Sequence, residues 1–584
     1  MNLHNFYDLQ SHTGQPAEAA ITGAAHRTTS QAHTRPFTLA WLREHAYILI
    51  PVAVAVGTGI LFASSTYGTQ DDDGYIFYQY ARNLAGGHGL SFNPGEVSYG
   101  TTSLLWVLLL AAVHRLLGMD IIIEAQAIGL ALYAASAGLW AWAAARWTGY
   151  RLAGMLGAGV YALELDPMKY SLQGLETGLT LLLFAALACL MLDAGPGWMR
   201  AALPGVILGL SMLNRPDSIV AAMPVAVLLV WGGRSAKAVA GRLALFGLCT
   251  LAVAAPWYGW LWLATGSPVP PTQTGKLLVF LPQEFGITLT HFQRLGLVDH
   301  AGFALEALAK FASNGGAVRL ALVGFGALML VTALLWVLKD TRRRYALWPL
   351  LIVACLLLQV AIYIWLFPLL KLRYLINLLP AGLVIGTAGL ALLWVKYRAG
   401  LASALHRVPV VPTAYRLANH RYVASLALLA ILGGGLVVYG YMVAKQLDNY
   451  RYYVAVQDVR RQVGLWLRQN TPTDSLIALE PIGAIGFYSD RRVLDLGGLT
   501  DTTTWPALTD GYRNPSAIAA LLESRGADYL VDYTQPEGIG GFSAALTQFE
   551  EGRARQVAVI SSPQAQSGNR GQYGSYTIFA MGKK

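Results

Sequence analysis

Runs of about twenty apolar residues recur along this chain, and they restrict it to a membrane-spanning fold. The first run covers residues 46–65, and a helix of about that length crosses a hydrocarbon core of roughly 30 Å. Only 13% of the 584 residues are charged, whereas soluble domains carry about 25%. Backbone polar groups inside a bilayer are satisfied within helices. The sequence therefore predicts a polytopic α-helical membrane protein.

We predict about eleven spans. A shorter apolar run, residues 101–117, carries His114 and Arg115, so we expect this segment to lie in the outer interface of the membrane without crossing it. The predicted spans are residues 46–65, 121–145, 152–165, 177–193, 201–213, 218–231, 243–264, 317–338, 347–367, 374–394 and 424–443.

Basic residues fall at every second connection between these spans, and acidic residues collect in the others. Arginine and lysine clusters occur within residues 146–151, 234–242, 339–344 and 396–421. Because cytoplasmic loops carry the excess of basic residues, we expect a cytoplasmic N-terminus. The chain is predicted to be a multi-pass protein of the plasma (inner) membrane, with its acidic loops on the extracytoplasmic side.

Three regions are predicted. Residues 1–45 are polar without periodicity, which is typical of a disordered cytoplasmic tail. Residues 46–443 form the transmembrane domain, with residues 66–120 as its first external loop. Residues 444–584 have the composition of a soluble extracytoplasmic α/β domain. Its helices are expected at residues 457–467 and 516–524, and its strands at 475–479, 493–496, 529–531, 557–560 and 576–580.

Several classes of function are disfavoured. The net charge of +10 is scattered among apolar runs, so no basic stripe is available for nucleic acid, and Cys189, Cys249 and Cys355 lie in apolar runs and offer no disulfide framework. No GxxxxGK[ST] phosphate cradle occurs, and the predicted cytoplasmic loops are almost free of carboxylates. An activated group would therefore reach the acids of the external loops on a membrane lipid.

The most unusual external stretch is Asp71-Asp72-Asp73. Three consecutive carboxylates repel one another, which raises at least one pKa unless a cation or a metal ion offsets the repulsion. Such a cluster suits a general base or a divalent-ion site. A solvated acidic turn is the alternative.

The residues after this triplet resemble the first external loop of the GT-C glycosyltransferases, and most closely that of the polyprenyl-phosphate-arabinose-dependent cell-wall arabinofuranosyltransferases that add terminal residues. The resemblance begins at Asp72-Asp73-Gly74-Tyr75 and continues through Gly87-His88-Gly89 to Asn93-Pro94-Gly95-Glu96. It extends over about 420 residues. The further motifs are Gly174-Leu175-Glu176-Thr177, Asn214-Arg215-Pro216-Asp217, Gly266-Ser267-Pro268-Val269-Pro270 with Thr272 and Lys276, Leu372-Arg373-Tyr374-Leu375 and Gly483-Ala484-Ile485-Gly486-Phe487-Tyr488-Ser489-Asp490.

The resemblance implies a GT-C-like fold and the transfer of a sugar from a polyprenyl-phosphate donor to a hydroxyl acceptor in a glycan, lipid or protein. Asp72 or Asp73 is implied as the general base, and Glu176 as a second catalytic carboxylate that positions the sugar or the acceptor. Inversion at the anomeric carbon is implied. The donor phosphate would be held by cations at outer span ends, namely Arg215, Arg373 and Lys276, and the substrate by Tyr75, His88, Asn93 and Tyr374.

The resemblance leaves open whether the site binds a divalent metal, Mg²⁺ or Mn²⁺. The ligands would be Asp72, Asp73 and Glu176. The chain departs from the family in having three loop acids where two are usual. It also reads Val97-Ser98-Tyr99-Gly100-Thr101-Thr102-Ser103 where a proline is usual before Leu-Trp.

Some of these residues could have purely structural roles instead. Arg215 could snorkel from a helix end, although Asp217 is placed to pair with it, and His88 suits a turn between glycines. A transporter or flippase of lipid-linked sugars and a non-catalytic glycan-binding subunit of an envelope assembly are the rival functions.

The predicted topology is tested by cysteine labelling in a variant whose three native cysteines are replaced by alanine. We expect Ser98→Cys and Ser567→Cys to react with an impermeant maleimide in intact cells, and Thr341→Cys to react only after the membrane is permeabilised. Labelling of Thr341→Cys alone in intact cells would contradict the orientation.

Overall fold

A computed structural model describes most of the chain. The described residues are 38–66, 69–98, 100–192, 197–231, 235–307, 309, 344–366, 371–389, 450–509, 514–534, 542–550, 553–566 and 574–582. The chain divides into two compact units, residues 1–44 and residues 45–584, and the second unit carries the site. Residues 1–37 of the predicted tail lie outside the described residues.

The first two-thirds of the described residues are almost entirely helical. Within them, four helices are long and apolar enough to cross a membrane, at Leu39–Thr66, Ile121–Thr148, Ala236–Thr265 and Leu347–Leu366. These lie in α1 (Leu39–Thr66), α4 (Ile121–Thr148), α10 (Ala236–Thr265) and α14 (Arg344–Leu366). The other helices here are α2 (Asp72–Ala85), α3 (Leu104–Leu117), α5 (Arg151–Ala162), α6 (Leu165–Leu172), α7 (Thr177–Leu192), α8 (Met199–Asn214), η2 (Pro216–Ala221), α9 (Ala222–Trp231), α11 (Pro271–Phe285), α12 (Leu289–Gln293), residues 297–307, η3 (Leu372–Leu375) and Leu378–Gly389.

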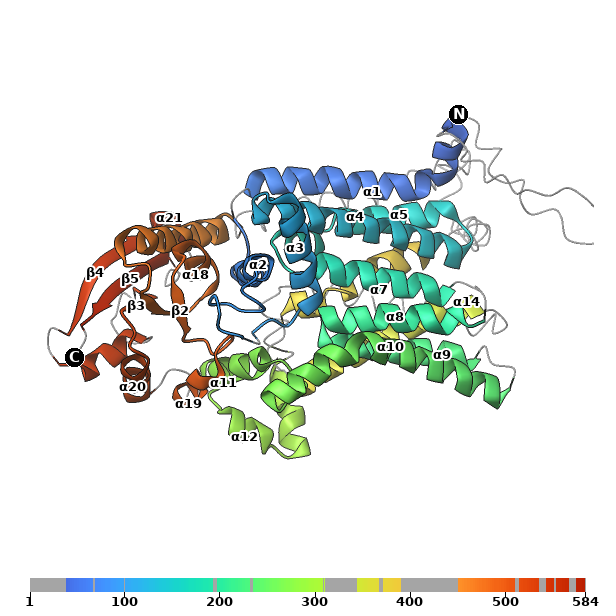
Figure 1. The fold of residues 1–584 in the computed structure, drawn as a ribbon. Coiled ribbons are helices and arrows are strands. Elements are labelled where there is room, and N and C mark those ends of the chain that lie inside the picture. The colour runs from blue at the N-terminus through green and yellow to red at the C-terminus, as the bar shows by residue number, and fades with distance from the viewer. Residues whose placement is uncertain are drawn as a thin grey trace, which may run out of the picture. The chain divides into compact units, whose positions relative to one another are not determined.

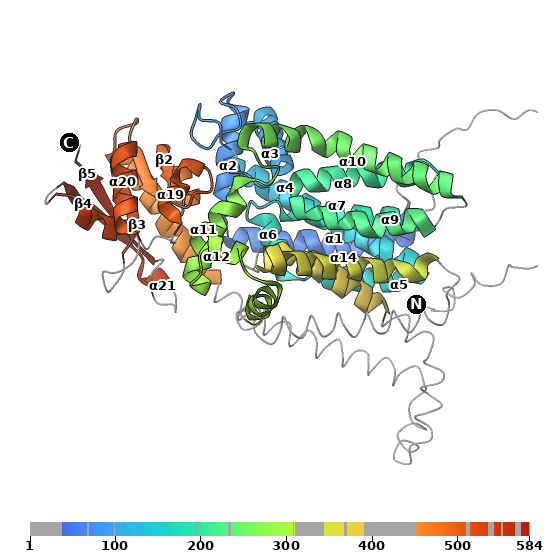
Figure 2. The same ribbon diagram turned by 90° about the horizontal axis from the view of Figure 1, so that it is seen from below.

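Helices α4, α7, α8 and α10 pack in that order as neighbours (Figures 1 and 2). Large side chains fill the spaces between helices: the rings of Trp140 and Trp147 both lie within 6.3 Å of the Trp348 ring from α14. Dispersion among such buried groups is what holds membrane helices together, because lipid is as apolar as their side chains.

Nine of the predicted spans overlap with these helices, while the predicted spans at 317–338 and 424–443 lie outside the described residues. The number of spans is therefore not established by the structure. The run predicted to lie in the interface is the 14-residue helix α3, which is shorter than the roughly 20 residues of a typical span.

The acidic triplet belongs to a helix and is not a loop. Helix α2 runs from Asp72 to Ala85, and Asp71 is its N-cap, with a side chain that accepts a hydrogen bond from the Asp73 backbone N–H. Carboxylates at a helix N-terminus are favoured by the cap and by the helix dipole. The sequence analysis assigns residues 66–120 to an external loop, so it does not reveal the helical start at the acids.

The C-terminal region is an α/β domain, as the sequence predicts. Its five-stranded sheet has the order β2-β1-β3-β5-β4, with parallel pairing among β1, β2 and β3 and antiparallel pairing of β5 with β3 and β4. The strands are β1 (Leu476–Leu479), β2 (Arg492–Asp495), β3 (Tyr529–Tyr533), β4 (Ala554–Ser561) and β5 (Ser575–Met581). Its helices are residues 450–470, α18 (Gly483–Ser489), α19 (Trp505–Leu508), α20 (Pro515–Arg525) and α21 (Pro563–Gln566), with 3₁₀ turns η4 (Thr502–Thr504) and η5 (Phe542–Gln548).

The start of α2 is docked against this domain. The Asp72 carboxylate accepts hydrogen bonds from the backbone N–H groups of Gly483 (3.2 Å) and Ala484 (3.0 Å) at the start of α18. It also lies 3.3 Å from Arg460 Nη1. Asn93 exchanges two 2.9 Å hydrogen bonds with the backbone of Val493 in β2. The external loop is thus tied to the C-terminal domain, and the alternative of a solvated acidic turn is wrong.

One face of helix 450–470 completes this docking. Tyr450 OH accepts a hydrogen bond from Gln173 Nε2 (2.9 Å), and Tyr453 OH donates one to Asp71 Oδ2 (3.0 Å). Together with Arg460, these residues follow helical spacing, so their side chains share one face. That face contacts both acidic segments, the one at residues 71–73 and the one that leads to Glu176.

The structure also refines the labelling experiment. Ser98 is buried and hydrogen-bonded to Tyr80, whereas Val97 is 61% exposed. Val97→Cys is therefore the better position for testing the side on which the first external loop lies.

The docking is tested by Gly483→Ala. A Cβ atom there would lie 2.0 Å from the main-chain oxygen of Asp72, so we expect overpacking to destabilise the fold by about 1–3 kcal/mol. The change is measured as a lower midpoint of thermal unfolding and faster proteolysis of the detergent-solubilised chain. Gly302→Ala is the control, since a Cβ at Gly302 meets no atom within 4 Å. Equal midpoints for the two variants would contradict the docking.

Candidate active site

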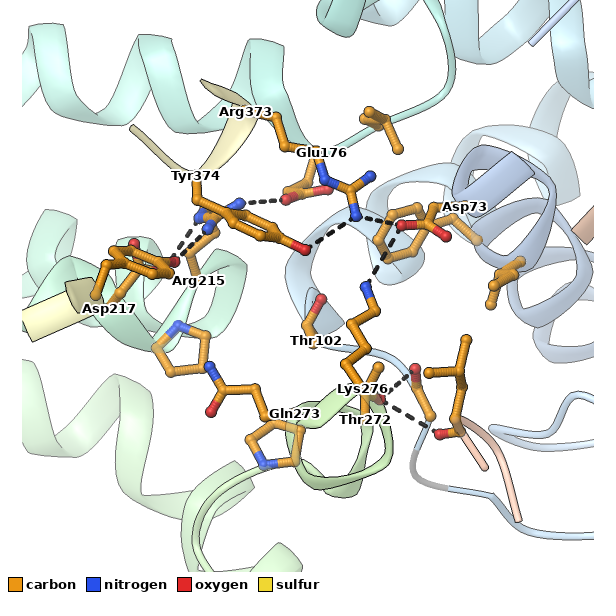
Figure 3. Close-up of a pocket in the computed structure, with 18 residues that line it drawn as sticks. Asp73, Thr102, Glu176, Arg215, Asp217, Thr272, Gln273, Lys276, Arg373 and Tyr374 are labelled. Atoms are coloured by element: carbon orange, nitrogen blue, oxygen red, sulfur yellow. Dashed lines mark hydrogen bonds and ion pairs between the residues drawn. The ribbon is translucent and has the colours of Figure 1, made fainter. Parts of the chain in front are cut away.

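A pocket lies where α2, α11 and the ends of several membrane helices meet (Figure 3). Separate parts of the chain build its wall: the first turn of α2, the segment before α7, the connection after α8, the start of α11, and the 3₁₀ turn η3. Its lining residues are Asp73, Ile76, Phe77, Gly100, Thr102, Leu175, Glu176, Arg215, Pro216, Asp217, Pro270, Thr272, Gln273, Lys276, Tyr363, Arg373, Tyr374 and Leu499.

Asp73 is bound by two cations in this pocket. Arg373 Nη2 donates to Asp73 Oδ2, and Lys276 Nζ lies 3.5 Å from the same oxygen. Arg373 Nη1 also lies 3.8 Å from Asp71 Oδ1. Burial acts to raise the pKa of Asp73, but Arg373, Lys276 and Lys371 outweigh it and hold that pKa far below its usual range. Asp73 is therefore a paired carboxylate.

Arg215 is the centre of a second ionic group. Its Nη1 donates to Glu176 Oε1 (2.7 Å), its Nε to Asp217 Oδ1 (3.2 Å) and its Nη2 to Tyr363 OH (2.7 Å). Gln359 Nε2 donates to the other Asp217 oxygen at 2.7 Å. The expected pairing of Arg215 with Asp217 is confirmed. Because three side chains already share the Arg215 guanidinium, this group rigidly positions Glu176.

Tyr374 lies in η3, ahead of the helix Leu378–Gly389, and between the two ionic groups (Figure 3). Its ring stacks on Tyr363 with a centroid distance of 5.6 Å and an interplanar angle of 3°. The guanidinium carbons of Arg215 and Arg373 lie 5.3 and 5.0 Å from its ring centroid, within the range of cation–π attraction. Burial opposes ionisation of this phenol, but Arg373, Lys276 and Lys371 together lower its pKa to about 7.

Helix α11 places Lys276 in the site. It begins at Pro271, and proline is favoured in the first turn of a helix. Thr272 Oγ1 donates to the backbone oxygen of Gly100 (2.8 Å) and lies 3.4 Å from that of Leu499. Lys276 follows Thr272 by one helical turn, so both side chains lie on the same face. Anchoring of Thr272 therefore directs Lys276 toward Asp73.

The C-terminal domain supplies Leu499 to the pocket wall. Asp495, at the end of β2, accepts hydrogen bonds from the backbone N–H groups of Gly497 (2.8 Å), Leu499 (2.7 Å) and Thr500 (2.6 Å). A buried carboxylate thus fixes the loop that carries Leu499. The domain is part of the site wall.

Six of the predicted site residues meet in this pocket, namely Asp73, Glu176, Arg215, Lys276, Arg373 and Tyr374. Their catalytic and binding roles remain predictions. Asp72, Tyr75, His88 and Asn93 do not line it.

The four residues outside the pocket have other surroundings. Asp72 faces Arg460 and α18, and burial raises its pKa. Tyr75 packs against Phe487 and Tyr488, with ring centroids 5.5 and 5.4 Å away. His88 is exposed in the turn after α2, and Asn93 binds β2. Docking and turn formation account for these positions without a substrate.

The side chains do not fit the metal set that the sequence left open. Among the described residues, no three His, Cys, Asp or Glu side chains gather where they could hold a metal ion. Of the proposed set, Asp72 contacts Arg460, Asp73 contacts Lys276 and Arg373, and Glu176 contacts Arg215. Each of these three carboxylates is thus paired with a cation of the chain itself.

Several lining residues have no catalytic or substrate-binding role predicted from the sequence. Asp217 and Thr272 lie within the family motifs, so their spacing offers a signal. Tyr363 lies in an apolar span, and Leu499 follows β2 some 400 residues after Asp73. Neither position has a local pattern that marks it.

Comparisons with known proteins bear on the fold. Residues 448–578 match a family described as a domain of unknown function (DUF8728). No curated protein matches the sequence. Among solved structures, the chain is similar to the archaeal oligosaccharyltransferase AglB from Archaeoglobus fulgidus in complex with an inhibitory peptide and a dolichol-phosphate. The identity is 13%, the TM-score is 0.56, and the match covers 90% of this chain and 80% of AglB.

A second similar structure is the Archaeoglobus fulgidus oligosaccharyltransferase tethered with an acceptor peptide containing the NVT sequon, at 14% identity and a TM-score of 0.54. That match covers 85% of this chain and 70% of the other. ArnT from Cupriavidus metallidurans, bound to undecaprenyl phosphate, has 15% identity, a TM-score of 0.47 and coverages of 92% and 98%. The oligosaccharyltransferase likeness confirms the GT-C fold.

The environment of Tyr374 is tested by a pH titration. With a pKa lowered to about 7, Tyr374 should be a neutral phenol well below pH 7 and a phenolate above it. We expect an ultraviolet absorbance step of tyrosinate between about pH 6 and 8 that disappears in Tyr374→Phe. Tyr529→Phe, in β3 and away from the pocket, is the control and should retain the step. A step that persists in Tyr374→Phe would contradict the assignment.

Proposed function

We propose that this chain is a membrane glycosyltransferase that transfers a sugar from a polyprenyl-phosphate donor to a hydroxyl acceptor on the extracytoplasmic face. The observation that carries the proposal is the pairing, within a GT-C fold, of one carboxylate, Asp73, with two largely buried cations, Lys276 and Arg373. A base and an anion site side by side are what glycosyl transfer from a phosphate requires. The AglB structure contains a dolichol-phosphate, which supports a lipid-linked donor.

In the proposed reaction, the Asp73 carboxylate accepts the proton of the acceptor hydroxyl. The acceptor oxygen attacks the anomeric carbon, and a new C–O bond forms as the bond from that carbon to the phosphate oxygen breaks. The electron pair leaves with polyprenyl phosphate. Lys276 and Arg373 stabilise the charge that develops on this leaving group, and an arginine can do so with two parallel hydrogen bonds.

The Arg215 group has a positioning role in this proposal. Glu176 is held by Arg215 in the pocket wall, where its carboxylate can accept hydrogen bonds from sugar or acceptor hydroxyls. Arg215 shares its donors among Glu176, Asp217 and Tyr363, so Lys276 and Arg373 are the stronger candidates for the phosphate. A single displacement at the anomeric carbon, with Asp73 as the base, implies inversion. Glu176 is engaged with Arg215 and is not placed as a free nucleophile.

The sequence resemblance favours arabinofuranose as the transferred sugar. The decisive experiment supplies membranes containing the chain with radiolabelled polyprenyl-phosphate sugars, arabinose first, and measures both labelled product and released polyprenyl phosphate. We expect equal amounts of transfer and release with one of these donors. A chain that folds and inserts but transfers from none of them would overturn the proposed function, and transfer of another sugar would overturn only the arabinofuranose assignment.

The base is tested by Asp73→Asn. A general base contributes about 10²–10⁴-fold, so we expect the transfer rate to fall by that factor. Asp490→Asn is the matched control, since Asp490 is an exposed residue that caps the C-terminus of α18. Its φ of 52° is a conformation that asparagine tolerates. The control should keep its rate. Equal rates for wild type and Asp73→Asn would remove Asp73 from the mechanism.

A further inference from the structure

The two cations proposed for the donor phosphate already hold an acid of the chain. Lys276 and Arg373 are the cations best placed for a lipid phosphate, and their side chains are only 16% and 13% exposed. Both contact the same oxygen of Asp73. Asp73 therefore occupies the anion position of a two-cation site.

The cations exceed what Asp73 alone can satisfy. Within the described residues, the buried Nε of Arg373 has no hydrogen-bond partner, although a buried donor without a partner is costly. Lys371 adds a third positive charge close enough to act on Asp73. Three cations therefore face two carboxylates, Asp73 and Asp71, the second of which lies 3.8 Å from Arg373. A further anion would be stabilised here.

We propose that Asp73 and the phosphate of the lipid donor compete for Lys276 and Arg373, so that phosphate binding releases Asp73 to act as the base. This inference rests on the proposed function. It adds that donor binding comes before Asp73 becomes able to accept the proton. A carboxylate gripped by two cations has a low affinity for a proton. As the phosphate takes over hydrogen bonds from Lys276 and Arg373, the affinity of Asp73 for a proton rises.

The exchange has consequences at both ends of the reaction. Before the donor binds, Asp73 is too weak a base to activate an acceptor or a water molecule. After transfer, the leaving phosphate carries an additional negative charge and holds both cations. Return of the Asp73 carboxylate, after it has lost its proton, then helps to displace polyprenyl phosphate from the site.

The inference is tested by binding, without turnover. Undecaprenyl phosphate is titrated into the full chain in nanodiscs, and its Kd is compared for wild type and Asp73→Asn. Removal of a competing charge-assisted contact should tighten binding by about tenfold. An unchanged or weaker affinity would overturn the exchange; a weaker one is the result that a metal bridge through Asp73 would give.

Three controls sharpen the test. Asp490→Asn should leave the Kd unchanged. Lys276→Ala should weaken binding. Asp73→Asn should then tighten binding by a smaller factor in the Lys276→Ala background than in the wild-type background, because one of the two cations is gone. Inorganic phosphate is the second probe: tightening for inorganic phosphate but not for the lipid would show a free-phosphate site and overturn the lipid part of the inference.

A second test uses the wild-type chain, so it does not depend on whether a variant folds. Carbodiimides react with protonated carboxyl groups, so Asp73 should be modified slowly alone and faster when undecaprenyl phosphate is bound, as read by peptide mass spectrometry. Slower or equal modification would contradict the exchange. If sugar transfer is observed but the affinity and the modification do not change, the proposed function stands and the exchange is wrong.

Discussion

The site depends on how three adjacent acids are neutralised. Asp71, Asp72 and Asp73 stand at the start of one helix, where uncompensated like charges would be costly to bury. Tyr453 and the helix cap hold Asp71, Arg460 and the α18 amides hold Asp72, and Lys276 with Arg373 holds Asp73. Arg373 also lies 3.8 Å from Asp71. One helical turn therefore joins the membrane helices, the C-terminal domain and the pocket.

In this arrangement the C-terminal domain helps to position the residues of the pocket. Arg460 and α18 fix Asp72, and the next residue along α2 is Asp73 in the pocket. The loop held by Asp495 places Leu499 in the same pocket. Because an error of about 1 Å in a catalytic group is costly, the docked domain acts as a support that sets the position of the proposed base.

Much of this organisation could be predicted from the sequence. The apolar runs and the strand patterns of the last 140 residues depend on local periodicity, which is why helices such as α4 and α10 and all five strands are predictable. The motif residues Asp73, Glu176, Arg215, Lys276 and Arg373 are marked by the resemblance, and the fold brings them together. The directions in which neighbouring side chains point could not be predicted from these local patterns.

Asp72 and Asp73 show the reason. In a loop they would be equivalent; as consecutive residues of a helix, their side chains point about 100° apart, one toward α18 and one toward the pocket. Asn93 and Tyr75 likewise contact residues about 400 positions away in the sequence. Such contacts depend on the packing of distant segments, which no local pattern encodes.

A structure of the full chain in nanodiscs with undecaprenyl phosphate tests the central claim most directly. The account predicts the phosphate within hydrogen-bonding distance of Lys276 Nζ and the Arg373 guanidinium, with the Asp73 carboxylate no longer bonded to both cations. A phosphate bound elsewhere, with Asp73 still held by Lys276 and Arg373, would contradict it.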